Sequence, residues 1–329
     1  MKQKKTDSGA EKKQPAGRLP MIATVTANPA VDYTVTVTEP IGVNAVNRTD
    51  DELITAGGKG INVSLILQQL GIPTTVYGFL AGATGSMIAE RLRRTQIPTD
   101  WINVPDQMTR INLKIRQNSG VTELNGKGVS VSQAESAQML EKLRRYGEQD
   151  YIVLAGTIPA SAPADYYAGM MEALSETGVR FAVDTTGEPL RHAIEKKPFV
   201  IKPNLPELCG LLGVGIDTWW DALPYGKQLI DMGAQNVLLS LGAEGALLFT
   251  AERRVWHLSA PHGTVKNAVG AGDAMLGGFL AACASGQPLT EALRMGVAAG
   301  SATAFSEWIA HRSQIDSLLA QLPQPTELL

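Results

Sequence analysis

From about residue 76 onward, short apolar runs alternate with longer amphipathic stretches, and this alternation limits the folds open to the chain. The runs are rich in β-branched residues and end in glycine or polar residues, which is typical of buried strands. Strands that alternate with helices favour a mostly parallel sheet covered on both faces, so we predict a three-layer, Rossmann-like α/β fold. The predicted strands are TVYGFLAG, YIVLAG, RFAVDTT, FVIKPN and NVLLSLG, and the predicted helices span residues 134–146, 163–175, 206–212 and 221–232.

Two segments, residues 33–56 and 108–126, follow a different pattern in which polar and apolar residues alternate. A period of two is typical of strands with one face in water. The second segment also contains Asn118-Ser119-Gly120, which predicts a turn between two strands. We therefore expect a small β-sheet that projects from the main body, as a lid over a site or as a dimer surface.

Composition excludes several classes of function. The net charge of −3 gives no electrostatic basis for binding nucleic acid or a membrane surface, and no apolar run reaches the length of a membrane-spanning helix. The four histidines lack the spacing of metal ligands, and Cys209 and Cys283 lie in apolar sequence, as reduced thiols of cytoplasmic proteins do. Residues 1–20 are charged and lack the apolar core of a secretion signal, so we predict a disordered extension before a single domain over residues 21–329.

Polar residues follow several of the predicted strands. Asp184, Asn204 and Ser240 each stand at or just after the end of a different strand. Because ligands of parallel α/β sheets bind outside the carboxyl ends of the strands, we expect these side chains at one site. The segment AVGAGD, residues 268–273, precedes a late predicted helix and is expected at the same place.

The stretch KNAVGAGDAMLGG puts the carboxylate of Asp273 at the beginning of an apolar helix. The amide groups at a helix N-terminus bind anions, and glycine lets a ligand approach the backbone, so the amides of residues 271–273 can form an anion hole. A carboxylate beside such a hole suits a general base that deprotonates a hydroxyl group attacking a phosphate. The alternative is a helix-capping aspartate. A dinucleotide fingerprint is excluded, because Met275 stands where its third glycine is required.

A second glycine cluster, Gly57-Gly58-Lys59-Gly60, precedes another apolar helix. It is not a Walker loop, because Gly60 follows the lysine where Ser or Thr is required. The helix N-terminus offers a second place for a polar or anionic ligand, or the glycines only permit tight packing of helix against strand.

Together the segments GGKGIN and NAVGAGDAMLGG resemble the two signatures of the PfkB-type sugar kinases, which have the ribokinase fold. The resemblance spans nearly the whole chain from Met21 and includes, in order, TANPAVD, TRINLKI, TELNG, DTTGEPL, KPNLPEL and SLGAEGAL. The segments NPAVD, TRINLKI and DTTGEPL are most similar to the branch that phosphorylates sugar phosphates, which contains 1-phosphofructokinases and tagatose-6-phosphate kinases.

The resemblance implies a role for each matching residue. Asp273 matches the catalytic base, and the residues matching the anion hole are Gly270, Ala271 and Gly272. The residues matching sugar contacts are Asp32, Gly57, Gly58 and Asn62. The candidates for binding the phosphate already present on the substrate are Lys59, Arg110 and Lys114, with Arg48 as a further one. Even spacing puts Arg110 and Lys114 on one face of a strand, although each basic residue could instead be a solvated surface charge.

On the nucleotide side, the matching residues are Lys202, Asn204, Glu207, Ser240, Gly242, Gly245 and Gly272. Asn204 and Glu207 are expected to hold Mg²⁺, directly or through water, because magnesium needs few protein ligands. These two residues could also be a helix cap and a first-turn acid, which is compatible with the same role.

The resemblance thus implies a cytoplasmic kinase that uses ATP and Mg²⁺ and acts on a ketose phosphate, with fructose 1-phosphate as acceptor and fructose 1,6-bisphosphate as product. The alternatives are a tagatose-6-phosphate kinase and a sugar-phosphate-binding regulator without catalysis, although a regulator would not need a base at Asp273. The expected partners are ATP, a sugar phosphate and a second copy of the chain bound through the small sheet. Neither nucleic acid nor a membrane is expected.

Overall fold

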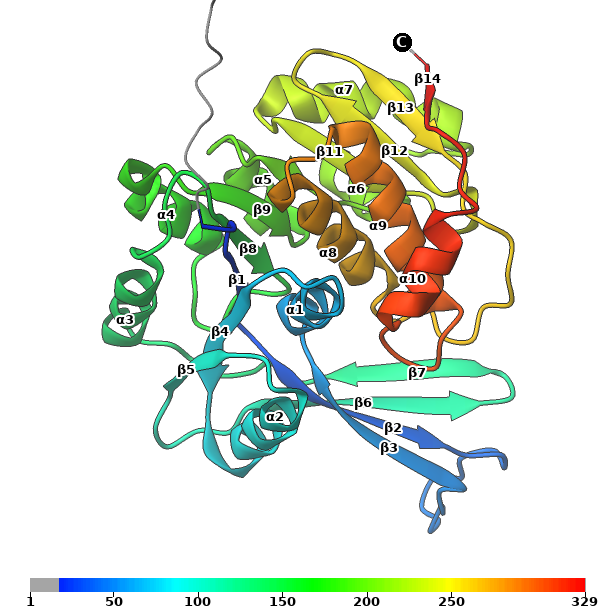
Figure 1. The fold of residues 1–329 in the computed structure, drawn as a ribbon. Helices are drawn as coiled ribbons and strands as arrows, with labels where there is room; N and C mark the ends of the chain where they lie inside the picture. The colour runs from blue at the N-terminus through cyan, green and yellow to red at the C-terminus, as the bar shows by residue number, and fades with distance from the viewer. Residues whose placement is uncertain (1–17, 329) are drawn as a thin grey trace, which may run out of the picture.

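The computed structural model describes residues 18–328, which form a large sheet, helices on both of its faces and a small separate sheet (Figure 1). Of the extension predicted for residues 1–20, residues 1–17 therefore lie outside the described residues. Arg18 contacts the core, where its guanidinium forms an ion pair with the buried carboxylate of Asp150. Asp150 also accepts a hydrogen bond from the amide of Met21, which fixes the chain just before the first strand.

The large sheet has the strand order β14-β13-β12-β11-β10-β9-β8-β1-β4-β5 and is parallel from β5 to β11. The remaining pairs, from β11 to β14, are antiparallel. The central strands are buried throughout, as their unbroken apolar runs predict. The strands are β1 (Ile22–Thr26), β4 (Thr74–Leu80), β5 (Thr99–Asn103), β8 (Tyr151–Ala155), β9 (Arg180–Asp184), β10 (Val200–Ile201), β11 (Asn236–Ser240), β12 (Ala246–Thr250), β13 (Val255–Leu258) and β14 (Thr326–Glu327).

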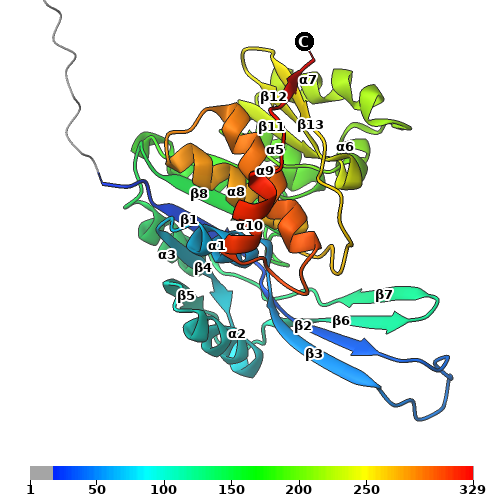
Figure 2. The same cartoon turned by 45° about the vertical axis from the view of Figure 1, so that its right-hand side comes forward.

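Helices cover both faces of the large sheet, which confirms the predicted α/β fold (Figure 1, Figure 2). One face packs against α1 (Lys59–Gln69), α8 (Ala271–Ala284), α9 (Leu289–Ala304) and α10 (Arg312–Leu319). The other face packs against α3 (Gln133–Leu143), α4 (Tyr166–Ala173), α5 (Gly187–Ile194), α6 (Leu205–Leu212) and α7 (Leu223–Met232). A further helix, α2 (Gly82–Thr95), packs against the β4 edge and the small sheet.

Helix α8, which carries Asp273 in its first turn, is almost entirely buried between α1 and α9. Two glycines permit this close packing. A Cβ on Gly278 would lie 2.6 Å from the carbonyl oxygen of Met295, and a Cβ on Gly277 would lie 2.9 Å from the side chain of Ile66. Because a close-packed interior leaves little freedom to a buried helix, the position of Asp273 relative to the large sheet is well defined.

The small sheet, or lid sheet, projects from the main body beside α2 (Figure 2). Its strand order is β3-β2-β6-β7, with β2 and β6 parallel and the two outer pairs antiparallel. The strands are β2 (Ala30–Thr36), β3 (Asp51–Gly57), β6 (Arg110–Gln117) and β7 (Gly120–Asn125). They confirm the strands predicted within residues 33–56 and 108–126, and Asn118-Ser119 forms the predicted turn.

The two faces of the lid sheet differ in polarity, because side chains along a strand alternate between faces. One row of directly paired apolar residues crosses all four strands: Ile54, Tyr33, Leu113 and Leu124. The neighbouring row is polar and lies on the opposite face: Thr55, Asp32, Asn112 and Asn125. Asp32 is therefore on the polar face of the lid sheet.

Two predicted elements differ from the structure. The strand predicted from FVIKPN is reduced to β10, because Pro203 has no amide to continue the ladder and Asn204 already caps the next helix. The helix predicted over residues 221–232 begins as the 3-10 turn η2 (Trp219–Ala222), and the α-helical part follows with Pro224 in its first turn. Within residues 18–328, no helix has both the length and the apolar character needed to cross a membrane.

Candidate active site

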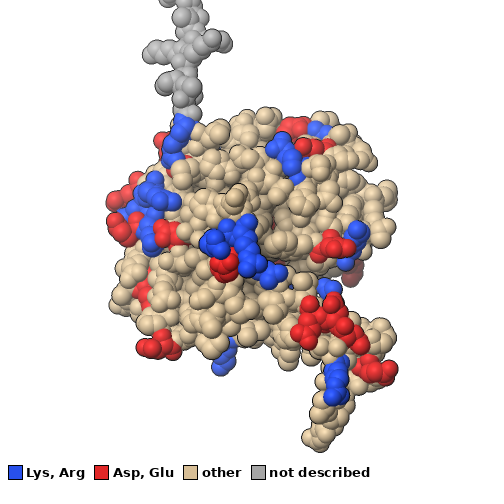
Figure 3. Space-filling view, turned by 60° about the horizontal axis from the view of Figure 1, so that its bottom comes forward, with Lys and Arg blue, Asp and Glu red and all other residues tan. Residues whose placement is uncertain are grey.

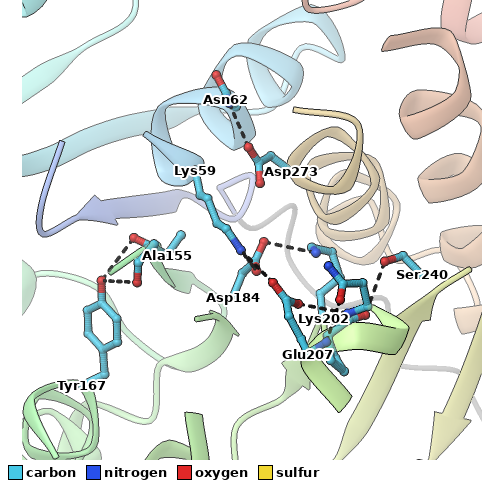
Figure 4. A network of polar contacts seen from close by, with 12 residues as sticks. Lys59, Asn62, Ala155, Tyr167, Asp184, Lys202, Glu207, Ser240 and Asp273 are labelled. Atoms are coloured by element: carbon cyan, nitrogen blue, oxygen red, sulfur yellow. Dashed lines mark hydrogen bonds and ion pairs between the residues drawn. The ribbon is translucent and has the colours of Figure 1, made fainter. Parts of the chain in front are cut away.

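Four charged side chains from different elements meet at the carboxyl edge of the large sheet (Figure 4). Asp184 ends β9, Lys202 follows β10, Lys59 begins α1 and Glu207 lies in the first turn of α6. The Nζ of Lys59 lies 2.7 Å from Asp184 Oδ1 and 3.6 Å from Glu207 Oε1. The Nζ of Lys202 lies 3.3 Å from Asp184 Oδ2. From the sequence we predicted Asp184 at this edge but assigned it no role. In the structure it forms ion pairs with both lysines.

The charges of this network support one another. Burial opposes the charge of Asp184, yet Lys202 and Lys59 hold the pKa of its carboxyl group below the ordinary value. Burial also opposes the charge of Lys59, but Asp184 and Glu207 hold the pKa of its ammonium group above the ordinary value. The Lys59 side chain is 31% exposed, so the network presents a charged ammonium group to a ligand.

Asp273 points from the first turn of α8 toward α1, where the Nδ2 of Asn62 donates a hydrogen bond to its Oδ2 at 2.8 Å (Figure 4). Asp273 is only 8% exposed. Burial first, and the negative charge of Asp184 second, raise the pKa of Asp273 to about 6, although Lys59, Asn62 and Lys202 act in the opposite direction. A carboxyl group with this pKa can accept a proton from a hydroxyl group near neutral pH.

The backbone before Asp273 forms a tight turn that leaves amide groups open. Gly270 has a φ of 81°, a left-handed conformation that favours glycine. The amide of Ala271 donates to the carbonyl of Ala268 at 3.2 Å, so in this structure it is engaged within the turn. Among the described residues, the amides of Gly272 and Asp273 have no backbone acceptor. A Cβ on Gly272 would lie 3.1 Å from the Nζ of Lys202, so that ammonium group borders the same space.

A cavity of about 590 Å³, the edge cavity, opens beside this turn. Lys59 and Asp273 both line it. It also brings together every residue predicted on the nucleotide side: Lys202, Asn204, Glu207, Ser240, Gly242, Gly245 and Gly272. Its more apolar part includes residues that the sequence did not single out, among them Val265 and Phe305. These apolar residues come from scattered segments, so no local motif could have indicated them.

Asn204 and Glu207 form the N-terminal cap of α6. The amide of Glu207 donates to Asn204 Oδ1 at 2.8 Å, and the amide of Asn204 donates to Glu207 Oε2 at 3.0 Å. The capping role considered for them in the sequence is therefore confirmed, and it leaves Glu207 Oε1 beside Lys59. Within residues 18–328, no group of three or more His, Cys, Asp or Glu side chains could hold a metal ion.

A second cavity of about 250 Å³, the lid cavity, lies against the polar face of the lid sheet. Four of the residues predicted on the acceptor side line it: Asp32, Gly57, Asn62 and Lys114. A Cβ at position 57 would lie 2.5 Å from the carboxyl group of Asp32, so a larger residue there would displace that carboxyl group. Arg116 on β6 and Arg91 on α2 line the cavity too. The even spacing that indicated Lys114 also includes Arg116, two residues further along β6. Nothing in the sequence distinguishes Arg91 from its basic neighbours.

Asp32 is held in place from the parallel strand beside it. The Nδ2 of Asn112 donates to Asp32 Oδ1 at 2.9 Å, and the Nζ of Lys114 lies 3.9 Å from Asp32 Oδ2. Asn112 is paired directly with Asp32 in the register of β2 and β6. Asn112 therefore orients Asp32, a role that the sequence prediction missed although the even spacing from Arg110 to Lys114 includes it.

Arg110 is not in the lid cavity. Its guanidinium donates to the carbonyl oxygen of Asn28 at 2.8 and 3.1 Å and to that of Gly126 at 3.3 Å. The strand face predicted from the spacing with Lys114 is correct, but Arg110 lies at the first position of β6, at the root of the lid sheet. Its donors are thus directed at backbone carbonyls that join the lid sheet to the main body.

Three further residues predicted on the acceptor side do not line the lid cavity. The ammonium group of Lys59 lines the edge cavity and not the lid cavity, because Asp184 and Glu207 attract it. Arg48 is exposed in the connection between β2 and β3 and lines neither cavity. Gly58 is the N-cap of α1, where a Cβ would lie 2.6 Å from the side chain of Thr26, and it lines neither cavity.

The two cavities meet at the hydrogen bond between Asn62 and Asp273. Asn62 lines the lid cavity, and Asp273 lines the edge cavity. A ligand in each cavity would therefore bring its reacting end to the same carboxylate. The mostly parallel sheet between two layers of helices, together with the small lid sheet, defines a class of fold, the ribokinase-like α/β fold.

Comparison with known proteins narrows this class. Residues 25–309 match the pfkB family of carbohydrate kinases. The chain is 42% identical over 302 residues to the 1-phosphofructokinase of Bacillus subtilis, which covers 92% of this chain and 98% of that protein. It is 34% identical over 303 residues to the D-tagatose-1-phosphate kinase of Bacillus licheniformis, again over 92% and 98% of the two chains. The phosphofructokinase-2 of Escherichia coli in complex with fructose-6-phosphate has a TM-score of 0.83 at 27% identity, over 92% of this chain and 99% of that chain.

The chain therefore belongs to the pfkB family of carbohydrate kinases. Within the family it is a sugar-phosphate kinase homologous to 1-phosphofructokinases, and ATP is the phosphoryl donor that the family uses.

Proposed function

We propose that the chain transfers the γ-phosphoryl group of ATP to fructose 1-phosphate, which yields fructose 1,6-bisphosphate and ADP. The choice of acceptor is supported by the relative from Bacillus subtilis, a 1-phosphofructokinase that is 42% identical. ATP would occupy the edge cavity, and the sugar phosphate would occupy the lid cavity with its hydroxyl groups near Asp32.

The observation that carries the proposal is the position of Asp273, a buried carboxylate between the two cavities with a pKa raised to about 6. The acceptor hydroxyl gives its proton to Asp273 as its oxygen forms a bond to the γ-phosphorus. The bond from that phosphorus to the bridging oxygen breaks, and ADP leaves with this oxygen. The amides of Gly272 and Asp273 and the ammonium group of Lys59 would stabilise the charge on the transferred group.

The donor set at the edge of the sheet fits a Mg²⁺ ion that is held mostly by the nucleotide. The capping box already engages Asn204 Oδ1 and Glu207 Oε2, which leaves Glu207 Oε1, 3.6 Å from the Nζ of Lys59, as the carboxylate oxygen of this pair outside the box. Because magnesium commonly keeps several waters and binds substrate phosphates, Glu207 and Asn204 would hold it directly or through water. When bound, the ion would neutralise phosphate charge, while proton transfer belongs to Asp273.

The phosphate already on the acceptor would bind to basic side chains of the lid cavity: Lys114, Arg116 and Arg91. Lys114 is 15% exposed and its acidic neighbour, Asp32, lies 3.9 Å away, so its charge is only partly compensated. Arg91 on α2 lines the same cavity. The face of the molecule seen in Figure 3 has a cluster of Lys and Arg side chains at its centre. Opposite a neutral sugar, Arg91 and Arg116 would lack an anionic partner among the described residues and Lys114 would have only Asp32, which favours a phosphorylated acceptor.

Tagatose 1-phosphate is the second candidate acceptor, because one relative that is 34% identical is a D-tagatose-1-phosphate kinase. It takes the place of the tagatose 6-phosphate inferred from the sequence, since its phosphate has the same position as that of fructose 1-phosphate. A regulator without catalysis would have no use for a buried carboxylate between the two cavities.

A coupled assay of ADP release over a panel of acceptors tests the proposal. We expect the highest kcat/KM with fructose 1-phosphate when it is compared with tagatose 1-phosphate, tagatose 6-phosphate, fructose 6-phosphate, fructose and ribose. Asp273→Ala should lower kcat by about 10²–10⁴-fold. A higher kcat/KM with tagatose 1-phosphate would favour the second candidate, and no ADP release with any ketose phosphate would contradict the proposal.

A further inference from the structure

Part of the wall of the edge cavity is attached to the sheet by a side chain that lies outside the cavity. The turn after β11 supplies three wall residues: Gly242, Ala243 and Gly245. The carbonyl oxygen of Glu244, in the same turn, accepts a hydrogen bond from the Nε2 of His257 at 3.1 Å. Since a carbonyl only accepts, His257 must carry a proton on Nε2. His257 belongs to β13 and does not line the cavity.

His257 is the innermost ring of an aromatic stack. The ring of Trp219 lies 4.3 Å from that of His257, with an angle of 9° between the planes. The ring of Trp220 lies 3.9 Å from that of Trp219, at 24°. Trp219 also packs against the core, whereas Trp220 is 54% exposed. The tryptophans of η2 therefore stack on one side of the His257 ring and fix the orientation of its plane.

Among the described residues, the backbone of the turn has no hydrogen bond to a side chain other than the one from His257. Gly242 and Gly245 have φ values of 60° and 93°, which glycine adopts readily. The bonds from Leu241 N to Gly245 O, at 2.8 Å, and from Gly245 N to Gly242 O, at 3.2 Å, both run within the turn. The hydrogen bond from His257, by contrast, comes from a side chain of β13 and so connects the turn to another strand. The orientation of that ring is set by the stack.

We propose that His257 is a positioning residue for the nucleotide, and that Trp219 supports it. By holding the carbonyl of Glu244, His257 sets the place of the turn on which ATP or ADP rests, and thereby the affinity for the nucleotide. The inference rests on the proposed function in one respect, the assignment of the edge cavity to the nucleotide. Because neither ring touches Asp273 or its partners, the phosphoryl transfer step should be unaffected.

Calorimetric titration with ADP, together with kinetics in ATP, tests this role. His257→Ala loses one hydrogen bond and one stacking contact, so the Kd for ADP and the KM for ATP should both rise about three- to thirtyfold while kcat changes less than about twofold. His257→Gln keeps an N–H donor and should recover much of the affinity. His192→Ala on α5, outside the stack and both cavities, is the matched control and should bind ADP as the wild type does.

An ADP affinity of His257→Ala equal to that of the wild type would overturn the inference, as would a fall in kcat with no change in the KM for ATP. A wild-type chain that binds no ADP would instead contradict the proposed function. Trp219→Leu provides an independent variant if His257→Ala does not fold. It removes the stacked ring, so amide hydrogen exchange of residues 242–246 should become faster, and unchanged exchange with unchanged ADP affinity would likewise overturn the inference.

Discussion

At the scale of a single residue, the raised pKa that suits Asp273 to act as a base also lowers the stability of the folded chain. Its pKa is raised from 3.8 to about 6, by burial first and by Asp184 second. The folded chain therefore binds a proton at Asp273 more readily than the unfolded chain does. As the pH rises from about 4 to about 6, the free energy of unfolding decreases, and it stays lowered at higher pH. A shift of this size corresponds to on the order of 3 kcal/mol.

Asp273→Asn should consequently stabilise the protein at pH 8 by on the order of 3 kcal/mol and lower kcat about 10²–10⁴-fold. The amide oxygen can still accept the hydrogen bond from Asn62. Denaturant unfolding at pH 8 and pH 4 measures the effect, which should largely vanish at the lower pH because the wild-type carboxyl is protonated there. Asp51→Asn, on the exposed part of β3, is the control. A destabilised Asp273→Asn at pH 8 would mean that the attraction of Lys59 and Lys202 outweighs burial.

The same pKa predicts the acid limb of the pH profile. Below about pH 6, kcat/KM should fall about tenfold per pH unit, because a protonated Asp273 cannot take the proton of the acceptor. Asn62→Ala removes a hydrogen bond that favours the ionised form, so its acid limb should lie at higher pH than that of the wild type. Initial rates at substrate concentrations well below KM, measured across pH, give the acid limb of kcat/KM for the wild type and for Asn62→Ala, and identical limbs would show that Asn62 does not act on Asp273.

At the scale of elements, β6 carries basic side chains with separate tasks. Arg110 joins the root of the lid sheet to the main body, and Lys114 lines the lid cavity. Arg110→Ala should lower kcat/KM for fructose 1-phosphate and for fructose by similar factors, whereas Lys114→Ala should lower it about ten- to a hundredfold more for fructose 1-phosphate. Coupled assays with the two acceptors measure this ratio. A selective loss of activity on fructose 1-phosphate in Arg110→Ala would identify that residue as a phosphate ligand after all.

This division of tasks marks how far the sequence can predict the site. Asp184 and Ser240 could be placed together because parallel strands end at one edge of a sheet. The face of Arg110 and Lys114 could be predicted because alternation is a property of every strand. The environment of Arg110 could not be predicted, since its partners are backbone carbonyls, which no residue pattern in the sequence reveals. The direction of Lys59 was equally inaccessible, because a long flexible side chain turns toward whichever acids the fold brings near.

At the scale of the whole molecule, the apolar row of the lid sheet remains partly exposed, with Ile54 at 37% and Leu124 at 57%. We propose that a second copy of the chain covers this face and that the lid sheets form a homodimer. Leu124→Glu should then convert the dimer to a monomer, which light scattering coupled to size exclusion measures. Val121→Glu is the matched control, since Val121 is 59% exposed but lies on the opposite face of β7. A monomeric wild type at micromolar concentration would contradict the dimer.

The parallel pairing of β2 with β6 also determines when the lid sheet can be completed during synthesis. Asp32 and Asn112 face each other across this pair although they are 80 residues apart in the chain. The chain between them builds β3, α1, β4, α2 and β5, so the hairpin of β2 and β3 leaves the ribosome long before its parallel neighbour exists. During that interval it has an unpaired strand edge and an uncovered apolar face. Translation between β3 and β6 is therefore the period in which a chaperone would contribute most to the yield of folded enzyme.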